Sequence, residues 1–204
     1  MKAFLNFLSR ILTLFVYPKH KRQLKRKKLW RDLYTNYYGR QIFKTAESIG
    51  KGFYCGGESF VNKNTILKDY VCFNGMKISG SGRVIIGNHF HSGIECLMIT
   101  QNHNYEGNMI PYDEEYIYKD IEIDDFVWLG SRVTILPGTK IGKGAIIQAG
   151  SVVHGTIPAY AIAGGNPAKV FKYRNAEHFE KLESEGKVYI VRDAENPHGR
   201  IDRK

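Results

Sequence analysis

Residues 121–153 read IEIDDFVWLGSRVTILPGTKIGKGAIIQAGSVV, and this stretch decides the fold. An aliphatic side chain recurs in it at every sixth position. The positions are Ile123, Leu129, Ile135, Ile141, Ile147 and Val153. A period of six fits neither a helix nor simple strand alternation, and a fixed short repeat is typical of a solenoid. We therefore predict a parallel β-helix in which each hexad supplies one short strand and a turn.

Two further columns extend this pattern. A smaller and more mixed column runs four residues behind the first, through Val127, Val133, Thr139, Ala145, Ser151 and Ile157. Upstream, the same period passes through Phe60, Ile66, Cys72, Ile78, Val84, Phe90 and Cys96, one residue out of phase. With three hexads in each coil, the repeats between Tyr54 and Val170 predict about five or six coils.

The hexads stop between His103 and Asp120, where the sequence is polar, aromatic and acidic. Long loops that leave a rigid scaffold usually carry function. We therefore predict an inserted functional loop at residues 103–120. His103 stands at its mouth, and a histidine can act as a general base near neutral pH. Its position favours a catalytic role over that of an ordinary surface histidine, whereas the position of His89 and His91 does not.

Positive charge is concentrated in residues 1–38, which carry ten Lys and Arg residues and one acidic residue, Asp32. Residues 4–16 place apolar side chains on one helical face. An amphipathic helix followed by a basic cluster suits an anionic membrane surface, but a helix packed on the subunit or on a neighbour explains the pattern as well. The apolar stretch is shorter than the ~20 residues of a spanning helix, and Arg10 within it argues against a signal peptide.

Two other features complete the chain. Cys55, Cys72 and Cys96 are odd in number and lack metal-ligand spacing, so buried free thiols in a reducing cytoplasm are the simplest interpretation. Near the C-terminus, Asn175 is a predicted N-cap for a short helix with Phe179 and Leu182 as its apolar stripe. We expect this helix to cover the open edge of the solenoid.

The run Ile123–Ser131, the pairs Pro137-Gly138 and Ile141-Gly142, and the run Ala149–Val153 together resemble the hexapeptide-repeat acyltransferases. The ending Ile157-Pro158 with Ala163–Lys169 is similar to the sugar O-acetyltransferase branch, which includes galactoside and maltose acetyltransferases. The resemblance covers roughly residues 60–174. It implies an all-β, left-handed parallel β-helix, and this handedness comes from the resemblance alone.

The resemblance also implies a site. His103 falls where the family has the histidine that deprotonates the acceptor hydroxyl for attack on acetyl-CoA. The family binds acetyl-CoA between neighbouring subunits of a homotrimer. By position, the pantetheine arm would be lined by Trp128, Gly130, Ser131, Ala149 and Gly150, and the phosphates would be contacted by Lys169, Lys172 and Arg174. The glycines also suit solenoid turns without any ligand, and Trp128 also suits a subunit interface.

The acceptor side is less defined. Some family members carry an acceptor-orienting asparagine where this chain, aligned without gaps, has Phe73 with Asn74 beside it. We name His91, Tyr105, Tyr112 and Asp113 as candidate acceptor contacts.

The predicted organisation is a basic amphipathic arm at residues 1–38, the β-helix acyltransferase domain at 39–174, and a C-terminal helix and tail at 175–204. The expected function is acetyl-CoA-dependent O-acetylation of a sugar in a bacterial surface polysaccharide or its precursor. We expect a cytoplasmic homotrimer with no metal and no nucleic-acid partner. Contact between the arm and the inner membrane face is one of the two open interpretations of the arm.

Other functions remain open at this stage. The same histidine and groove could N-acetylate an amino sugar or nucleotide sugar, or inactivate a small antibiotic. A zinc hydrase such as a γ-type carbonic anhydrase would need three converging histidines, for which His89, His91 and His103 are the candidates. A trimeric scaffold without catalysis would keep the solenoid and the arm but would not need His103.

Overall fold

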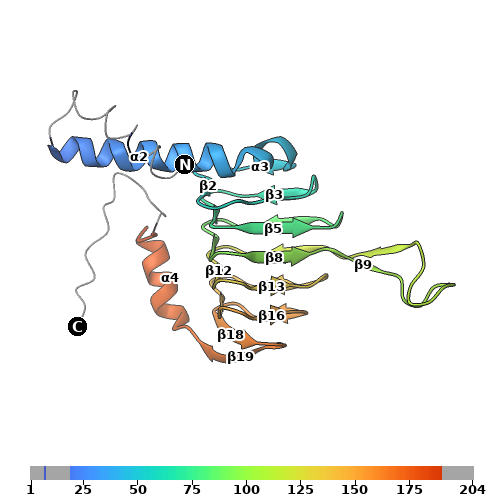
Figure 1. Cartoon of the computed structure of the whole chain (residues 1–204). Coiled ribbons are helices and arrows are strands. Elements are labelled where there is room, and N and C mark those ends of the chain that lie inside the picture. The colour runs from blue at the N-terminus through green and yellow to red at the C-terminus, as the bar shows by residue number, and fades with distance from the viewer. Residues whose placement is uncertain (1–6, 8–18, 190–204) are drawn as a thin grey trace.

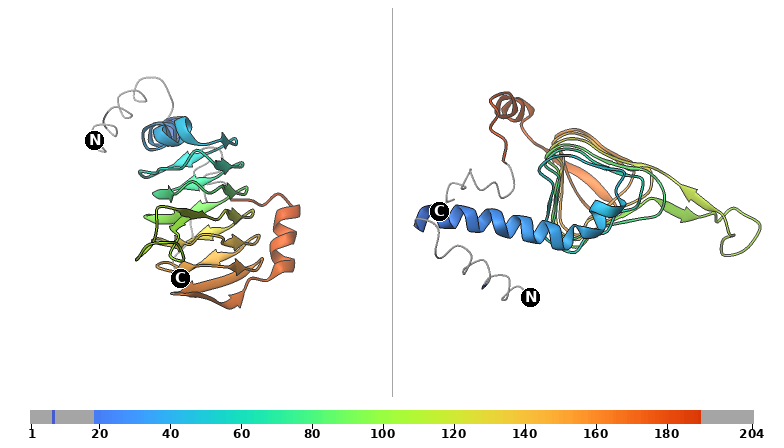
Figure 2. Two further views of the ribbon diagram at one scale, coloured as in Figure 1. Left: turned by 90° about the vertical axis from the view of Figure 1, so that its right-hand side faces the viewer. Right: turned by 90° about the horizontal axis from the view of Figure 1, so that it is seen from above.

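A computed structural model describes Phe7 and residues 19–189, with the backbone alone for residues 19–28. Short strands wind into a three-sided parallel β-helix (Figures 1 and 2). Sheet 1 contains β1 (Ser48–Ile49), β3 (Thr65–Leu67), β6 (Val84–Ile86), β11 (Ile121–Ile123), β14 (Lys140–Ile141) and β17 (Thr156–Ile157). Sheet 2 contains β2 (Tyr54–Cys55), β4 (Cys72–Phe73), β7 (His91–Ser92), β12 (Trp128–Leu129), β15 (Ile146–Ile147), β18 (Ala161–Gly165) and β19 (Ala168–Tyr173). Sheet 3 contains β5 (Met76–Ser79), β8 (Cys96–Ile99), β13 (Thr134–Ile135) and β16 (Val152–Val153). The predicted fold class is confirmed.

The downstream coils follow the hexad rule. Trp128 pairs with Ile146 in sheet 2, and Thr134 pairs with Val152 in sheet 3, each eighteen residues apart. Three hexads therefore close one coil. Both downstream columns point inward, and every member of them is at most 3% exposed. The pattern predicted this core correctly because each coil repeats the same inward positions.

The upstream column is out of phase at its first three positions. Phe60 is 44% exposed, and Ile66 is half-buried between two inward neighbours. Cys72 is buried but pairs with His91, in the same row as the exposed Trp128, and Phe73 takes the core position. The core there is filled by Val61, Leu67 and Phe73. The cause is coil length: Ile66 pairs with Ile85, nineteen residues later, and a strict period of six cannot follow that extra residue.

An aromatic ladder marks the corner between sheets 1 and 2. The His89 ring stacks between Tyr70 and Phe126, with ring centroids 4.8 and 4.9 Å away. The next coil has Gly144 at this position, where φ is +67°. The missing rung is filled by Phe179, whose ring packs 5.6 Å from that of Phe126. This contact docks the C-terminal helix on the solenoid.

The two ends of the β-helix are closed differently. At the N-terminal end lie α2 (Lys19–Tyr38) and α3 (Arg40–Thr45), with Ile42 buried in the core (Figure 1). Thr35 of α2 is buried, and its Oγ1 accepts a hydrogen bond from Cys55 N at 3.3 Å. The amphipathic helix predicted at residues 4–16 lies outside the described residues, apart from Phe7.

At the other end, β19 folds back antiparallel on β18. The helix α4 (Ala176–Ser184) begins as predicted, since Asn175 Oδ1 accepts from His178 N at 2.8 Å. It runs alongside the coils instead of covering their open end (Figure 1), because its apolar Phe179 is held in the corner ladder. Cys55, Cys72 and Cys96 are buried, and none of them forms a disulfide within the described part of the chain. Among the described helices, none is long and apolar enough to cross a bilayer.

Candidate functional site

The inserted segment is a β-hairpin that projects from the corner between sheets 3 and 1 (Figure 1). Its arms are β9 (Gln101–His103) and β10 (Tyr116–Tyr118), which pair antiparallel. Thr100 anchors the base: its side chain is fully buried, its hydroxyl donates to Ser79 O at 2.9 Å, and its carbonyl accepts from Lys119 N. A rigid base of this kind gives the first residues of the hairpin a fixed position relative to the coils.

His103 is enclosed by aromatic rings. Its imidazole stacks on Tyr112 with centroids 3.8 Å apart and planes 18° apart, and Tyr116 packs 4.6 Å away. His103 Nδ1 is buried without a hydrogen-bond partner among the described residues. This leaves Nε2 as the ring nitrogen that an acceptor would have to meet. Sequence reasoning missed Tyr116, although β9–β10 register places it directly opposite His103.

The other acceptor candidates on the hairpin differ in their surroundings. Tyr105 is 71% exposed, and Tyr112 is 45% exposed although it stacks on His103. Asp113 is half-buried, and its carboxylate already accepts hydrogen bonds from the hairpin itself. His103, Tyr112 and Asp113 are thus brought together, and Tyr105 lies further along the same hairpin.

The remaining acceptor candidate lies elsewhere. His91 sits on sheet 2, where it pairs with Trp128, and its Nε2 is 3.5 Å from Asn74 Nδ2. Phe73, aligned with the family's asparagine, is completely buried and cannot touch an acceptor. The structure therefore separates His91 from the hairpin.

Trp128 and its neighbours form an apolar strip on the outer face of sheet 2. Trp128 is 51% exposed and pairs with Ile146, which in turn pairs with Ile162. A cavity of about 500 Å³ lies between this face and α4, and its walls include His91, Trp128, Arg174 and Phe179. An exposed indole beside an apolar strip is suited to contact with the apolar part of a ligand or with another subunit.

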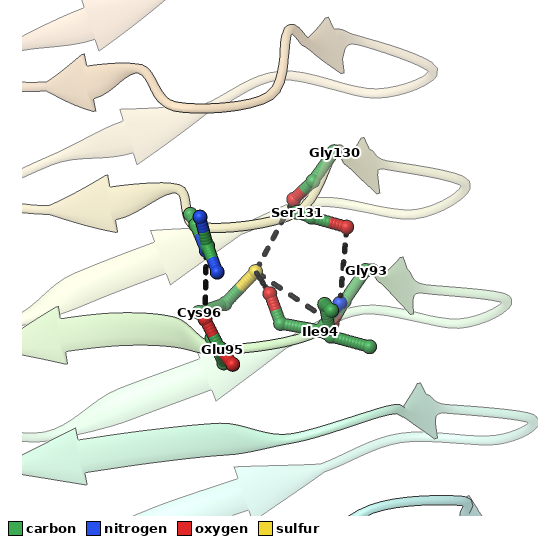
Figure 3. Close-up of polar contacts among 7 residues, drawn as sticks. Gly93, Ile94, Glu95, Cys96, Gly130 and Ser131 are labelled. Atoms are coloured by element: carbon green, nitrogen blue, oxygen red, sulfur yellow. Dashed lines mark hydrogen bonds and ion pairs between the residues drawn. The ribbon is translucent and has the colours of Figure 1, made fainter.

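The turn from sheet 2 to sheet 3 is closely packed (Figure 3). Ser131 Oγ accepts from Ile94 N at 3.3 Å, and Cys96 Sγ donates to Gly130 O at 3.2 Å. A methyl group on Gly130 would clash with the backbone of Ala149 in the next coil. Burial raises the pKa of the Cys96 thiol, which disfavours a nucleophilic thiolate.

Ala149 and Gly150 stay exposed at the next turn. The predicted pantetheine positions Gly130, Ser131, Ala149 and Gly150 therefore stack in one column on adjacent coils.

The three predicted phosphate contacts are not equivalent. Lys169 and Lys172 are exposed on β19. The Arg174 guanidinium instead donates to Gly144 O at 3.1 Å and lies over the Phe179 ring, 4.6 Å from its centroid. Arg174 thus already helps to dock α4, whereas the exposed lysine side chains could extend to a phosphate group.

Two findings constrain the chemistry. Among residues 19–189 as described, no three His, Cys, Asp or Glu side chains gather as metal ligands would. The histidine triad that a zinc hydrase needs does not form, because His103 is on the hairpin and His89 is stacked in the corner ladder. In addition, β9, which ends at His103, projects from one corner of the solenoid, while β12, which begins at Trp128, belongs to sheet 2 on the side where α4 runs (Figure 1). One chain alone does not bring the predicted base and the predicted donor site together.

Comparisons with known proteins agree with the β-helix fold. Residues 120–155 match the family described as bacterial transferase hexapeptide (six repeats). The chain is 33% identical over 129 residues to a putative lipopolysaccharide biosynthesis O-acetyl transferase, WbbJ, of Escherichia coli, covering 59% of this chain and 63% of that protein. It is 30% identical over 139 residues to galactoside O-acetyltransferase of Lactococcus lactis, covering 68% and 61%.

A solved galactoside acetyltransferase in complex with coenzyme A has the same fold, with a TM-score of 0.54 at 20% identity over 87% of this chain and 84% of that one. The chain spans a little over three fifths of the length of the two curated relatives. In its six-residue repeats, its β-helix and these matches, the chain is similar to the hexapeptide-repeat transferases, and in particular to two O-acetyltransferases.

Proposed function

We propose that the protein transfers the acetyl group of acetyl-CoA to a sugar hydroxyl of a bacterial surface polysaccharide or its precursor, with His103 as the general base. The observation that carries the proposal is the setting of His103. It stands at the base of the hairpin, with Nδ1 buried and its ring stacked on Tyr112. The similarity to a putative lipopolysaccharide O-acetyl transferase and to a galactoside O-acetyltransferase supports the choice of acceptor.

The proposed reaction needs one base and no covalent enzyme intermediate. Nε2 of neutral His103 takes the proton of the acceptor hydroxyl as its oxygen attacks the thioester carbonyl. The tetrahedral intermediate collapses, the C–S bond breaks, and the CoA thiolate takes the proton back from His103. The products are an acetyl ester and CoA. Backbone N–H groups at the coil turns would stabilise the oxyanion.

The donor site is proposed to lie between two copies of the chain. Trp128, Gly130, Ser131, Ala149 and Gly150 would line the pantetheine arm of acetyl-CoA, and Lys169 and Lys172 would meet its phosphates, since flexible ammonium groups suit phosphate oxygens. The separation of Trp128 from His103 within one chain supports a homotrimer in which a neighbour completes each site.

We also propose that the N-terminal arm determines where the enzyme lies. The basic N-terminal arm would hold the enzyme at the inner face of an anionic membrane, close to a lipid-linked acceptor.

The test is acetyl transfer by His103→Ala beside the wild type. CoA thiol release would be followed with a panel of glycan acceptors that includes amino sugars, and acetyl-CoA binding would be measured by titration calorimetry. We expect the turnover of His103→Ala to fall by about 10²–10⁴-fold, because a general base contributes that much, while acetyl-CoA binding is retained.

Acetyl-CoA binding to both forms is the control for folding. A His103→Ala enzyme within threefold of the wild-type rate, or a wild type that binds no acetyl-CoA at millimolar concentration, would contradict the proposal. Faster transfer to amines than to hydroxyls would move the assignment to N-acetylation.

A further inference from the structure

The tip of the hairpin is folded onto its own base by one carboxylate. Asp113 Oδ2 accepts from Asn104 Nδ2 at 3.2 Å and from Asn108 N at 3.3 Å, and Asp113 Oδ1 accepts from Glu115 N at 3.0 Å. The backbone N–H of Asp113 donates to Asn104 O at 3.1 Å. These bonds tie the two ends of the loop at residues 104–115 to each other and to its turn, so the hairpin beyond His103 is a closed loop.

This closure places the residue before Asp113. Tyr112 lies flat on the His103 imidazole, with ring centroids 3.8 Å apart. Tyr116 contacts the same imidazole from the paired strand, 4.6 Å away. Both tyrosines are still more than two fifths exposed, so neither is needed to fill the solenoid core. Their shared contact is the imidazole.

We propose that Tyr112 and Tyr116 are positioning residues that fix the plane of the His103 ring, and that Asp113 holds Tyr112 in place. The inference rests on the proposed function, in which His103 is the base, and it gives Tyr112 and Asp113 a different role from the acceptor contacts predicted from the sequence. The need for such a clamp follows from His103 Nδ1, which is buried without a hydrogen-bond partner among the described residues. A catalytic histidine is usually oriented by a hydrogen bond at its second nitrogen; here ring stacking supplies the orientation.

The stacking explains how Nε2 can be aimed without that bond. Two rings against one imidazole restrict rotation about its side-chain torsions, while the ring edge that carries Nε2 stays open to the acceptor. A misplacement of about 1 Å in a reacting group can cost on the order of 10²-fold in rate. Loss of the clamp should therefore lower kcat and leave the KM for the acceptor nearly unchanged.

The test compares Tyr112→Phe, Tyr112→Leu and Asp113→Ala in the full-length protein. The first readout is the NMR shift of the His103 ring protons in protein labelled at histidine, with His103→Ala used to assign the signal. A ring stacked at 3.8 Å shifts these protons upfield. We expect Tyr112→Phe to keep the upfield shift, and Tyr112→Leu and Asp113→Ala to lose most of it.

The second readout is the split between kcat and KM. Tyr112→Phe should stay within about twofold of the wild type, while Tyr112→Leu and Asp113→Ala should lose about tenfold or more in kcat. Unchanged ring shifts and kcat in Tyr112→Leu would overturn the inference. A raised acceptor KM in Tyr112→Phe with the shift retained would also overturn it, because Tyr112 would then be a substrate contact through its hydroxyl.

The two readouts separate the two hypotheses. If the wild type acetylates no acceptor, the proposed function fails, and the ring shifts alone then decide whether the clamp exists.

Discussion

At the residue scale, His89 shows how one position in a repeat can accept a titratable side chain. Its ring is a rung of the corner ladder between Tyr70 and Phe126, and its backbone φ is +55°. Burial lowers the pKa of His89 below its ordinary value near 6.5, and the nearby carboxylates of Asp125 and Asp69 only partly oppose this. The folded protein therefore holds His89 neutral more strongly than the unfolded chain does.

The free energy of unfolding should therefore depend on pH through His89. Below about pH 6.5 the unfolded chain binds a proton at His89 that the folded chain takes up only at lower pH, so the stability present above pH 6.5 is lost as the pH falls. His89→Phe removes this titration and keeps an aromatic rung. The backbone conformation is compatible, since Phe126 and Tyr160 adopt the same positive φ on other coils.

The measurement is the thermal unfolding midpoint between pH 5 and 8. We expect the unfolding midpoint of His89→Phe to fall less between pH 8 and pH 5 than that of the wild type. His154→Gln is the matched control, because it removes a histidine that is exposed and lies outside the corner ladder. Equal slopes for His89→Phe and the wild type would show that His89 is not linked to folding.

The candidate site was predictable only in part at this scale. His103 was named as the candidate base because it stands where the hexads stop, which is a property of the sequence alone, and this assignment stays a prediction. Tyr116 could not, because its contact with His103 depends on hairpin register. Arg174 was assigned to phosphate by position, yet it reaches Gly144 O thirty residues away, a contact set by where α4 docks.

At the element scale, the repeat predicted the strands well wherever coil length is constant. The burial predicted for the downstream hexads was correct because each inward side chain packs on the equivalent side chain of the neighbouring coil. The phase failed at Phe60, Ile66 and Cys72, where a coil contains nineteen residues. The inserted loop proved to be a hairpin: alternation in Tyr116-Ile117-Tyr118 allows a strand, but a strand forms only with a partner, here Gln101–His103.

We predict that the basic N-terminal arm binds anionic membranes. A membrane-surface helix gains about 1 kcal/mol from each Lys or Arg near an anionic surface. Changing Lys25, Arg26, Lys27 and Lys28 to Gln keeps good helix formers and removes four charges. We expect the substituted protein to bind vesicles of anionic lipid at least about tenfold more weakly at physiological salt, because the charge contributions roughly add.

The readout is co-sedimentation with anionic and with neutral vesicles, and the thermal unfolding midpoint confirms the fold. The four substitutions leave Thr35 and its contact with Cys55 in place, which a deletion of residues 1–38 would remove. Two outcomes would contradict membrane attachment: equal binding of anionic vesicles by the wild type and the substituted protein, or equal binding of the wild type to anionic and to neutral vesicles. Packing on a neighbouring subunit would then remain as the role of the arm.

At the scale of the whole molecule, the outer surfaces of the β-helix are unequal. Sheet 1 presents Glu122, Lys140 and Thr156 to solvent, whereas sheet 2 presents Trp128, Ile146 and Ile162. Paired charges such as Glu122–Lys140, with Nζ and Oε1 2.8 Å apart, suit a free face. A face with an exposed indole suits a partner. The proposed base on the hairpin and the apolar strip on sheet 2 therefore belong to the same site only if two copies meet.

Mixed oligomers test this arrangement directly. His103→Ala and Trp128→Ala chains with different tags would be purified, unfolded together in equal amounts and refolded, and their acetyl transfer measured beside each variant alone. In a cyclic trimer each site takes His103 from one copy and Trp128 from the next, so every mixed trimer contains one site with both native residues. Random assortment makes three quarters of the trimers mixed, so the mixture should recover about a quarter of the wild-type rate although each variant alone is nearly inactive. A site contained within one chain would give no recovery, because every chain then lacks one of the two residues.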